Sequence, residues 1–272
     1  MVRLDVHPPQ FREPVTAGDV RALAHAAEDG GADDVWVSDH VILPRGSTRP
    51  PELFHDALTV LTWAAAVTDR VGLGTSVLVA PYRHPVLLAR ALASLDALSG
   101  GRLICGIASG WHRREFAALG VPFGGRGRRT DRVIADLRAL WAGADVPAGP
   151  LAGMRIAPGP ARPGGPPVWV GGDSDAGIAR AVRAGDAWHT TVADPGRLAE
   201  RMAVLRRACA DAGRAPLPVS VRWRATPEQV RERAPALAEL GVVHLLVDPP
   251  PAETRPARDL VAAYRDAVPR GA

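Results

Sequence analysis

Val242-Val243-His244-Leu245-Leu246-Val247 is the stretch that decides the fold, because it is an almost uninterrupted apolar run. A strand with one face in water alternates apolar and polar residues, whereas a parallel strand covered on both faces is apolar nearly throughout. Helical patterns precede the run at residues 227–240 and follow it at residues 257–267. This order predicts a buried parallel strand between two helices, the repeating unit of α/β proteins.

Outward from this stretch, strand-like and helix-like patterns alternate along the chain. The first half predicts four strand–helix pairs: 2–7 and 17–30, 35–38 and 56–68, 71–79 and 85–98, 102–108 and 129–141. The second half predicts four more: 168–170 and 175–184, 187–190 and 195–212, 217–223 and 227–240, 243–247 and 257–267. Such a series predicts an α/β fold of the (β/α)8 TIM-barrel type, with residues 1–272 as one domain.

A doubly wound open sheet is the alternative architecture for the same series. Its dinucleotide-binding fingerprint should follow the first strand, but His7-Pro8-Pro9-Gln10 contains no glycine. The closed barrel is therefore favoured. Residues 143–167 interrupt the connection between the fourth and fifth strands and are expected to be an excursion over one barrel end, with a small hairpin at residues 149–156.

The composition is that of an ordinary globular protein with a sizeable core. Of its 272 residues, 47% are hydrophobic and 23% are charged. No apolar run approaches the roughly 18 residues of a membrane span, and the first ten residues lack the pattern of a signal peptide. A cytoplasmic protein without a membrane partner is expected. The two cysteines exclude a disulfide framework or a multi-thiolate metal site.

The net charge of +4 comes from 33 arginines scattered among 29 carboxylates. Nucleic-acid binders gather their cations on one face, so no nucleic-acid partner is expected. The densest cluster is Arg126, Arg128, Arg129 and Arg132. A solvated helix start is the ordinary interpretation of this cluster, and contact with an anion is the alternative.

The histidines are sorted by their place on the predicted strands, because active sites of such barrels lie at the carboxyl ends of the strands. His244 falls at the start of the last strand and is expected to be structural. His7, His40 and His189 fall at strand ends, where His40 suits acid–base work and His7 and His189 suit contact with substrate. No recognised metal-ligand spacing joins them, so no metal is expected.

Small residues at neighbouring strand ends predict a place for a flat ring. Glycine lets a ligand approach the backbone closely, and Gly74, Gly110, Gly171 and Gly172 all stand at such positions. The sequence Gly171-Gly172-Asp173-Ser174 also leads into a helix amino terminus, where free N–H groups favour a phosphate and Ser174 can be the cap. An ordinary tight turn with an N-cap is the equal alternative.

Several motifs occur in the order in which one known family carries them. They are Val35-Trp36-Val37-Ser38-Asp39-His40, Gly74-Thr75-Ser76-Val77, Tyr82-Arg83-His84-Pro85, Leu98-Ser99-Gly100-Gly101-Arg102-Leu103, Ser109-Gly110-Trp111 with Glu115-Phe116, Gly127-Arg128-Arg129-Thr130-Asp131, Pro166-Pro167-Val168-Trp169-Val170-Gly171-Gly172 and Ala184-Gly185-Asp186-Ala187-Trp188-His189. Over about residues 20–250 the chain resembles the luciferase-like monooxygenases, and within them the branch that uses coenzyme F420 most of all.

The resemblance implies a cofactor ring at the barrel mouth, resting on a bulge whose non-prolyl cis peptide bond matches Ser76-Val77. It places His40 at the reacting atoms. It assigns cofactor contacts, around the ring, along the ribityl chain and at the phosphate, to Asp39, Ser76, Val77, Gly110, Trp111, Gly171, Gly172, Asp173 and Ser174.

The expected activity is hydride transfer between F420 and a small organic substrate, with His40 moving the proton. An FMN-dependent monooxygenase that uses dioxygen is the first alternative, because it shares most motifs, and a non-enzymatic cofactor carrier is the second. Two departures from the family, a short segment at residues 223–227 and the trimmed excursion at residues 143–167, put the usual lid in doubt. They suggest an open site or one completed by a partner subunit, and a homodimer is expected.

Overall fold

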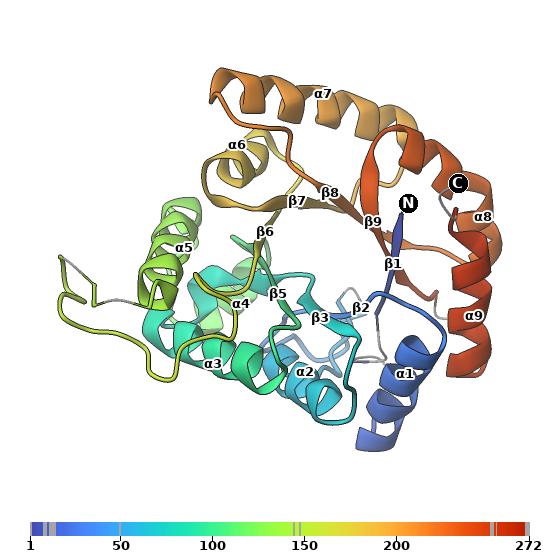
Figure 1. The fold of residues 1–272 in the computed structure, drawn as a ribbon, viewed down its shortest axis with the longest axis horizontal. Helices are drawn as coiled ribbons and strands as arrows, with labels where there is room; N and C mark the ends of the chain where they lie inside the picture. The colour runs from blue at the N-terminus through green and yellow to red at the C-terminus, as the bar shows by residue number, and fades with distance from the viewer. Residues whose placement is uncertain are drawn as a thin grey trace.

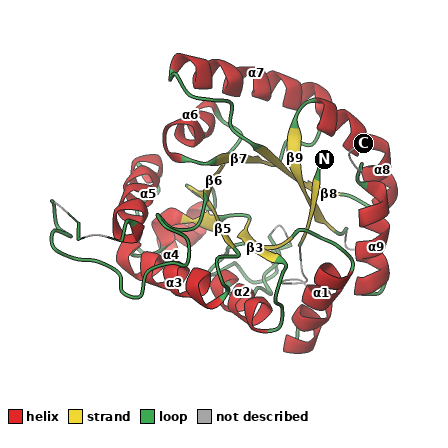
Figure 2. Ribbon diagram, viewed as in Figure 1, coloured by secondary structure: helices red, strands yellow, loops and turns green. Residues whose placement is uncertain are grey.

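The computed structural model describes residues 2–7, 10, 15–48, 50–143, 145–146, 148–250, 253 and 255–269. Within these residues parallel strands close into a barrel with helices around it (Figures 1 and 2). The strands are β1 (Arg3–Val6), β2 (Asp34–Val37), β3 (Gly72–Thr75), β4 (Leu78–Val79), β5 (Leu103–Ala108), β6 (Val168–Gly171), β7 (Ala187–Thr190), β8 (Val219–Arg224) and β9 (Val242–Asp248). Their order is β3-β2-β1-β9-β8-β7-β6-β5-β4, and a further pairing of β3 with β5 closes the ring. The predicted TIM-barrel architecture is confirmed.

The helices lie outside the barrel and begin where the sequence offers caps. Thr16 and Asp19 form a capping box at the start of α1, and Thr226 and Gln229 form one at the start of α8. The helices are α1 (Ala17–Asp29), α2 (Ala57–Ala66), α3 (Pro85–Leu98), α4 (Arg113–Ala118), α5 (Arg126–Trp141), α6 (Asp175–Ala184), α7 (Pro195–Asp211), α8 (Pro227–Glu239) and α9 (Ala257–Ala267), with a 3-10 turn η1 (Ala80–Tyr82).

The third barrel strand differs from its prediction. Residues 71–79 form two short strands, because the Ser76–Val77 peptide bond between β3 and β4 is cis. β3 pairs with β2 and with the start of β5, and β4 pairs with the end of β5. The interruption therefore forms a bulge at the carboxyl edge of the barrel, as the family resemblance implied.

The segment between β5 and β6 also differs from its prediction. Residues 113–118 form the unpredicted helix α4, which is too short to show a helical period in the sequence. Helix α5 begins at Arg126 rather than at residue 129, directly after Gly125, whose φ of 70° ends the preceding loop. Both changes bring side chains of this segment to the carboxyl end of β5.

The excursion at residues 143–167 lies at the amino-terminal end of the barrel, beside α3 and α5 (Figure 1). Arg162 N–H donates to Asp96 Oδ2 at the end of α3 (3.2 Å), and Pro167 O accepts from Cys105 N–H in β5 (2.9 Å). The hairpin predicted at residues 149–156 is wrong, because this stretch forms turns that contact Val146 without becoming strands. A connection from a helix to a strand lies opposite the mouth, so the described part of this segment cannot act as a lid.

The barrel interior is layered, because alternate residues of each strand point inward. In β2 and the residue after it the inward series is Asp34, Trp36 and Ser38, and in β9 it is His244, Leu246 and Asp248. The middle layer is the apolar cluster of Trp36, Ile104, Trp169, Ala187 and Leu246. Polar groups therefore occupy both ends of the interior, with a dry layer between them. No helix in the described ranges is long and apolar enough to cross a bilayer.

Candidate active site

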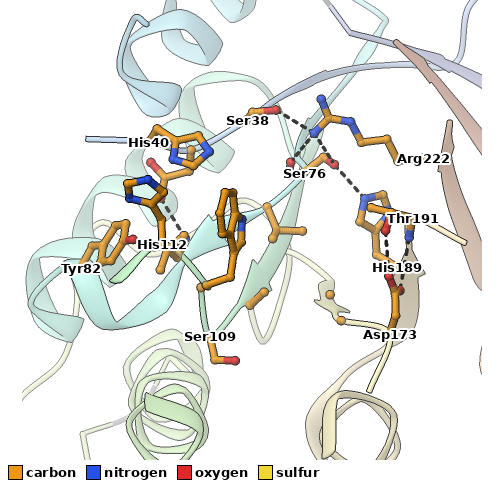
Figure 3. Close-up of a pocket in the computed structure, with 18 residues that line it drawn as sticks. Ser38, His40, Ser76, Tyr82, Ser109, His112, Asp173, His189, Thr191 and Arg222 are labelled. Carbon is orange, nitrogen blue, oxygen red and sulfur yellow. Dashed lines mark hydrogen bonds between the residues drawn. The ribbon is translucent and has the colours of Figure 1, made fainter. Parts of the chain in front are cut away.

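A cavity of about 380 Å³ opens at the carboxyl ends of the strands (Figure 3). Most of the residues predicted from the sequence line it: Asp39, His40, Ser76, Val77, Gly110, Trp111, Gly171, Gly172, Asp173 and His189. Of the remaining predicted residues, His7 and Ser174 do not line it. The structure also brings Tyr82, His112 and Arg222 to the same cavity.

His40 is held by a carboxylate that the sequence analysis did not select. Its Nδ1 lies 2.8 Å from Glu115 Oε2 on α4. An ionised carboxylate can only accept hydrogen bonds, so the proton of a neutral His40 is on Nδ1 and the lone pair is on Nε2. The imidazole side chain is 13% exposed and lines the cavity. His40 is therefore oriented as a group that can take up or release a proton at Nε2.

Glu115 is fully buried but remains ionised, because donors surround both of its oxygens. Oε1 accepts from the Val41 N–H (2.8 Å), and Oε2 also accepts from Tyr82 Oη (3.3 Å). Burial alone would raise the pKa of Glu115, but the hydrogen bonds from His40 and Val41 outweigh it and hold that pKa below its usual value. Burial and the nearby carboxylate in turn raise the pKa of Tyr82.

Arg222, on β8, is the other residue that the sequence analysis missed. Its Nη1 donates to Ser38 Oγ (2.7 Å) and to Ser76 O at the cis bulge (2.8 Å). Its Nη2 lies 3.2 Å from Asp248 Oδ2. Burial lowers the pKa of Arg222 and Asp248 opposes that effect, but a guanidinium stays charged in proteins. A fixed positive charge therefore lies on the cavity floor, opposite His40 in Figure 3.

The two other strand-end histidines support this floor. His189 is buried, with Nε2 2.8 Å from Ser76 Oγ and Nδ1 3.0 Å from Ser220 Oγ, and it stacks on Trp36. Burial, followed by the charge of Arg222, lowers the pKa of His189 to about 3 and keeps it neutral. His7 lies behind Ser38, with its Nε2 2.8 Å from that hydroxyl. His7 and His189 are thus joined to one hydrogen-bonded floor through Ser38, Ser76 and Arg222. Of the three strand-end histidines, His40 and His189 line the cavity.

Asp39 and Asp173 face the cavity, yet their carboxylates are already bonded to the protein. Both oxygens of Asp39 accept from Arg83, at 2.6 and 2.8 Å, and one also accepts from Val79 N–H. Asp173 Oδ2 accepts from Thr191 Oγ1 at 2.7 Å. These contacts fix the chain at the ends of β2 and β6. Ser174 caps α6 by accepting from Gly177 N–H.

The cavity wall includes glycines, which leave room for a flat cofactor ring and whose tight packing against neighbouring side chains excludes a Cβ. A Cβ on Gly110 would lie 2.5 Å from Val79 Cγ1, and one on Gly171 would lie 3.1 Å from Val77 Cγ1. Gly110 and Gly172 also have positive φ, of 74° and 131°. The cis bulge at Ser76–Val77, with Gly171 beside it, forms a smooth surface, and Trp111, 62% exposed, stands at the rim.

A second polar cluster lies at the opposite end of the barrel interior. In the described part of the chain, the one trio of metal-ligand side chains with its ligand atoms within 4.8 Å of one another is Asp5, Asp34 and His244. His244 Nδ1 is 3.0 Å from Asp5 Oδ2 and 3.5 Å from Asp34 Oδ2. This end has no part in the mouth cavity, in agreement with the structural role expected for His244.

Comparison with known proteins places the chain in a family. Residues 2–268 match the model of the luciferase-like monooxygenases. An uncharacterized protein of Mycobacterium tuberculosis is 30% identical over 214 residues, which cover 71% of this chain and 72% of that protein. The F420-dependent glucose-6-phosphate dehydrogenase of Beutenbergia cavernae is 43% identical over 134 residues, 47% of this chain and 38% of that protein.

Solved structures share the fold at low sequence identity. An F420-dependent secondary alcohol dehydrogenase in complex with an F420–acetone adduct has a TM-score of 0.81 at 18% identity, over 99% of both chains. The oxygenating constituent of 3,6-diketocamphane monooxygenase from Pseudomonas putida, in complex with FMN, has a TM-score of 0.81 at 15% identity, over 98% of both chains. The family match over nearly the whole chain, together with this barrel and its cis bulge, shows that the protein is an enzyme of the luciferase-like monooxygenase family.

Proposed function

We propose that the protein is an F420-dependent oxidoreductase that transfers a hydride between the deazaflavin and a small organic substrate. The observation that carries this proposal is the His40–Glu115 pair beside a cavity with a flat glycine wall. An F420-dependent enzyme needs a proton donor or acceptor beside a ring site, and the mouth of this barrel offers both. F420, when bound, supplies a carbon centre that accepts or donates a hydride and does not activate dioxygen.

The chain's own residues would hold the ring at the bulge. Val77, Gly110 and Gly171 line the cavity, and the two glycines leave their backbone open to a ring because they carry no side chain. Arg222 lies below the bulge, bonded to Ser76 O. Its fixed charge favours negative charge on a group bound above it, as preorganised donors do in other active sites.

His40 would move the proton that accompanies the hydride. Its Nε2 carries the lone pair, so it can take a proton from a substrate hydroxyl in the oxidative direction and return it to a carbonyl in the reductive direction. Glu115 holds the other ring nitrogen at 2.8 Å and stabilises the imidazolium form. The imidazole therefore needs no reorientation between the two protonation states.

Relatives support F420 as the cofactor. Two of them are named F420-dependent glucose-6-phosphate dehydrogenase, with 43% and 38% identity over about half of this chain. The alternative is an FMN-dependent monooxygenase, which the family description and the FMN complex of a structural neighbour favour.

A homodimer is part of the proposal, because a site completed by a partner subunit is one of the two arrangements that the sequence suggests. Leu87 and Leu98 on α3, which are 71% and 85% exposed, are apolar side chains that a second subunit could cover.

Cofactor titration distinguishes the two activities. Trp111 lines the cavity, so a bound ring should quench its fluorescence. A Trp111→Phe variant shows how much of the observed quenching comes from this tryptophan. We expect F420 to bind at least about tenfold more tightly than FMN, a difference of roughly 1.4 kcal/mol. Equal affinities, or tighter binding of FMN, would reject the proposal in favour of the monooxygenase.

A further inference from the structure

The start of α5 and the neighbouring helix α4 carry arginines that lack ion-pair partners. Among the described residues, no carboxylate lies within ion-pair distance of Arg113, Arg126, Arg128 or Arg132. Other arginines nearby are paired: Arg138, at the other end of α5, lies 2.6 Å from Asp186 Oδ2, and Asp131 pairs with arginines of α6. The four unpaired arginines therefore lie close together, at the starts of α4 and α5.

These arginines stand where positive charge disfavours the helix. The amino terminus of a helix carries the positive end of its dipole, and the first turn of α5 contains no acidic residue. Arg128 and Arg132 are four residues apart, a spacing at which like charges on a helix repel. A local arrangement that opposes stability without a compensating contact points to a functional role.

Arg126 connects this corner to the cavity. Its Nε donates to Gly110 O at 3.0 Å, and Gly110 lines the cavity. The guanidinium of Arg126 lies 4.0 Å from the ring centroid of Phe123, and that of Arg113 lies 4.1 Å from the same centroid. Both guanidinium groups therefore contact the same aromatic ring. Phe123 thus holds two cations in place beyond the cavity rim.

A second, smaller cavity follows along α5. It has a volume of about 250 Å³ and is lined by Gly124, Gly125, Arg128, Arg129 and Arg132. Arg129 is anchored by donating to Pro122 O and to Gly124 O, yet its Nε is buried without a hydrogen-bond partner. The cavity is therefore bounded by glycine backbone and by guanidinium groups, which suits an oxyanion.

We propose that this surface, defined by Arg113, Arg126, Arg128 and Arg132, binds the anionic tail of the cofactor, the phosphodiester-linked chain of γ-glutamates that F420 carries. The proposal rests on the proposed F420-dependent function. Carboxylates repeated along an extended chain match guanidinium groups repeated along α4 and α5, and each pair can form two parallel hydrogen bonds. FMN ends at its phosphate, so this surface also provides discrimination between the two cofactors.

Binding of two ligands to matched variants tests the proposal. The ligands are F420 with several glutamates and its precursor FO, which has the deazaflavin and ribityl chain but neither phosphate nor glutamates. The test variant is Arg113→Gln/Arg128→Gln/Arg132→Gln, which spares Arg126 and its bond to Gly110. The control variant Arg207→Gln/Arg231→Gln/Arg258→Gln removes the same charge from exposed positions on α7, α8 and α9, which lie away from α4 and α5 (Figure 1).

We expect the test variant to lose about tenfold in affinity for F420 at low salt, from three exposed ion pairs, and less than about twofold for FO. The control variant should bind both ligands like the wild type. Salt should weaken the binding of F420 to the wild type more steeply than its binding to the test variant. Melting temperatures should agree within a few degrees, because the side chains of Arg113, Arg128 and Arg132 donate no hydrogen bond to the described part of the protein.

Other outcomes overturn the inference in distinguishable ways. Unchanged F420 affinity in the test variant, or an equal loss for F420 and FO, rejects the tail site while leaving the proposed function intact, since the wild type still binds F420. An equal loss of F420 affinity in the control variant would mean that the loss comes from the lower net charge of the protein, and it would also reject the site. Failure of the wild type to bind either deazaflavin, with tight binding of FMN, rejects both proposals.

Discussion

The two ends of the barrel interior both bury ionisable groups, but only one end opens to a cavity. At the amino end, Asp5, Asp34 and His244 contact one another and are 0%, 2% and 6% exposed. At the carboxyl end, Glu115 is equally buried, but its partner His40 presents a free ring nitrogen to the cavity. Burial alone therefore does not identify the site. The site is identified by a polar atom that has no hydrogen-bond partner in the described protein and that a ligand can reach.

The pKa shifts at the two ends have different causes. At the amino end burial dominates, so it raises the pKa of Asp5 and Asp34 and lowers the pKa of His244 to about 4. At the mouth, donors outweigh burial and the pKa of Glu115 falls below its usual value. The amino end thus favours neutral forms, whereas the mouth keeps a buried anion that can stabilise a protonated His40.

An apolar layer separates the two clusters. Trp36 and Trp169 lie side by side, with ring centroids 5.1 Å apart, below His189 and above His244. Water and small ions have no polar path through such a layer. The two ends should therefore respond independently to substitution, and four predictions test that independence.

The largest effect is expected for His40→Ala. It should lower kcat by roughly a hundredfold or more, the usual scale for one general acid or base, and change cofactor affinity only modestly. Single-turnover hydride transfer measures it, once screening has found a substrate. His112→Ala removes an imidazole from the same cavity and serves as the control, with a much smaller loss. Wild-type hydride transfer by the His40→Ala variant would show that His40 is only part of the cavity wall.

His244→Gln should show the opposite profile. Losing the contact with Asp5 leaves a buried carboxyl without its partner, so the free energy of unfolding should fall by about 2 kcal/mol. Urea denaturation measures this change, while kcat should stay within about twofold of the wild type because the mouth is unaffected. A large loss of kcat with unchanged stability would disprove the separation of the two ends.

Glu115→Gln tests the carboxylate that orients His40. The amide keeps the shape of the side chain but not its charge, so kcat should fall by about tenfold while the dissociation constant of the cofactor stays the same. Tyr82→Phe removes the longer, 3.3 Å bond to the same oxygen and should have little effect. If KM or the cofactor dissociation constant rose while kcat stayed constant, Glu115 would act by holding the backbone at Val41 and not by orienting His40.

Asp34→Asn should give the smallest effect. It should change how the free energy of unfolding depends on pH. Because burial raises the pKa of Asp34, the folded protein binds more protons than the unfolded chain above the ordinary carboxyl pKa of about 4, and stability falls as the pH rises through that window. Between about pH 5 and pH 8, the free energy of unfolding of the variant should fall by about 1 kcal/mol less than that of the wild type. Asp211→Asn, at an exposed position of α7, should keep the wild-type slope. Equal slopes in all three proteins would contradict a buried, proton-binding Asp34.

Part of the candidate site was predictable because strand ends have sequence signatures. His40, Ser76 and Gly171 directly end or follow apolar strands, and in a parallel barrel these positions converge at one mouth. Glu115 belongs to a motif of the family but was given no role, because α4 is too short to show a helical period that would place its side chain. Arg222 was missed because a charged residue in a strand is usually exposed, and only the structure shows that Arg222 points inward on the same side of β8 as Ser220.

The sequence by itself determined the barrel, since continuous apolar strands alternating with amphipathic helices allow few other ways to bury both faces of a parallel sheet. It also predicted most of the residues that line the mouth cavity, though neither Tyr82 nor Arg222. Only the tertiary structure decided their partners: Glu115 meets His40 across 75 positions of sequence, and Arg222 meets Ser38 across 184. Such pairs form because barrel closure brings distant strand ends together, and the choice among nearby donors and acceptors depends on distances of a few tenths of an ångström that no local pattern encodes.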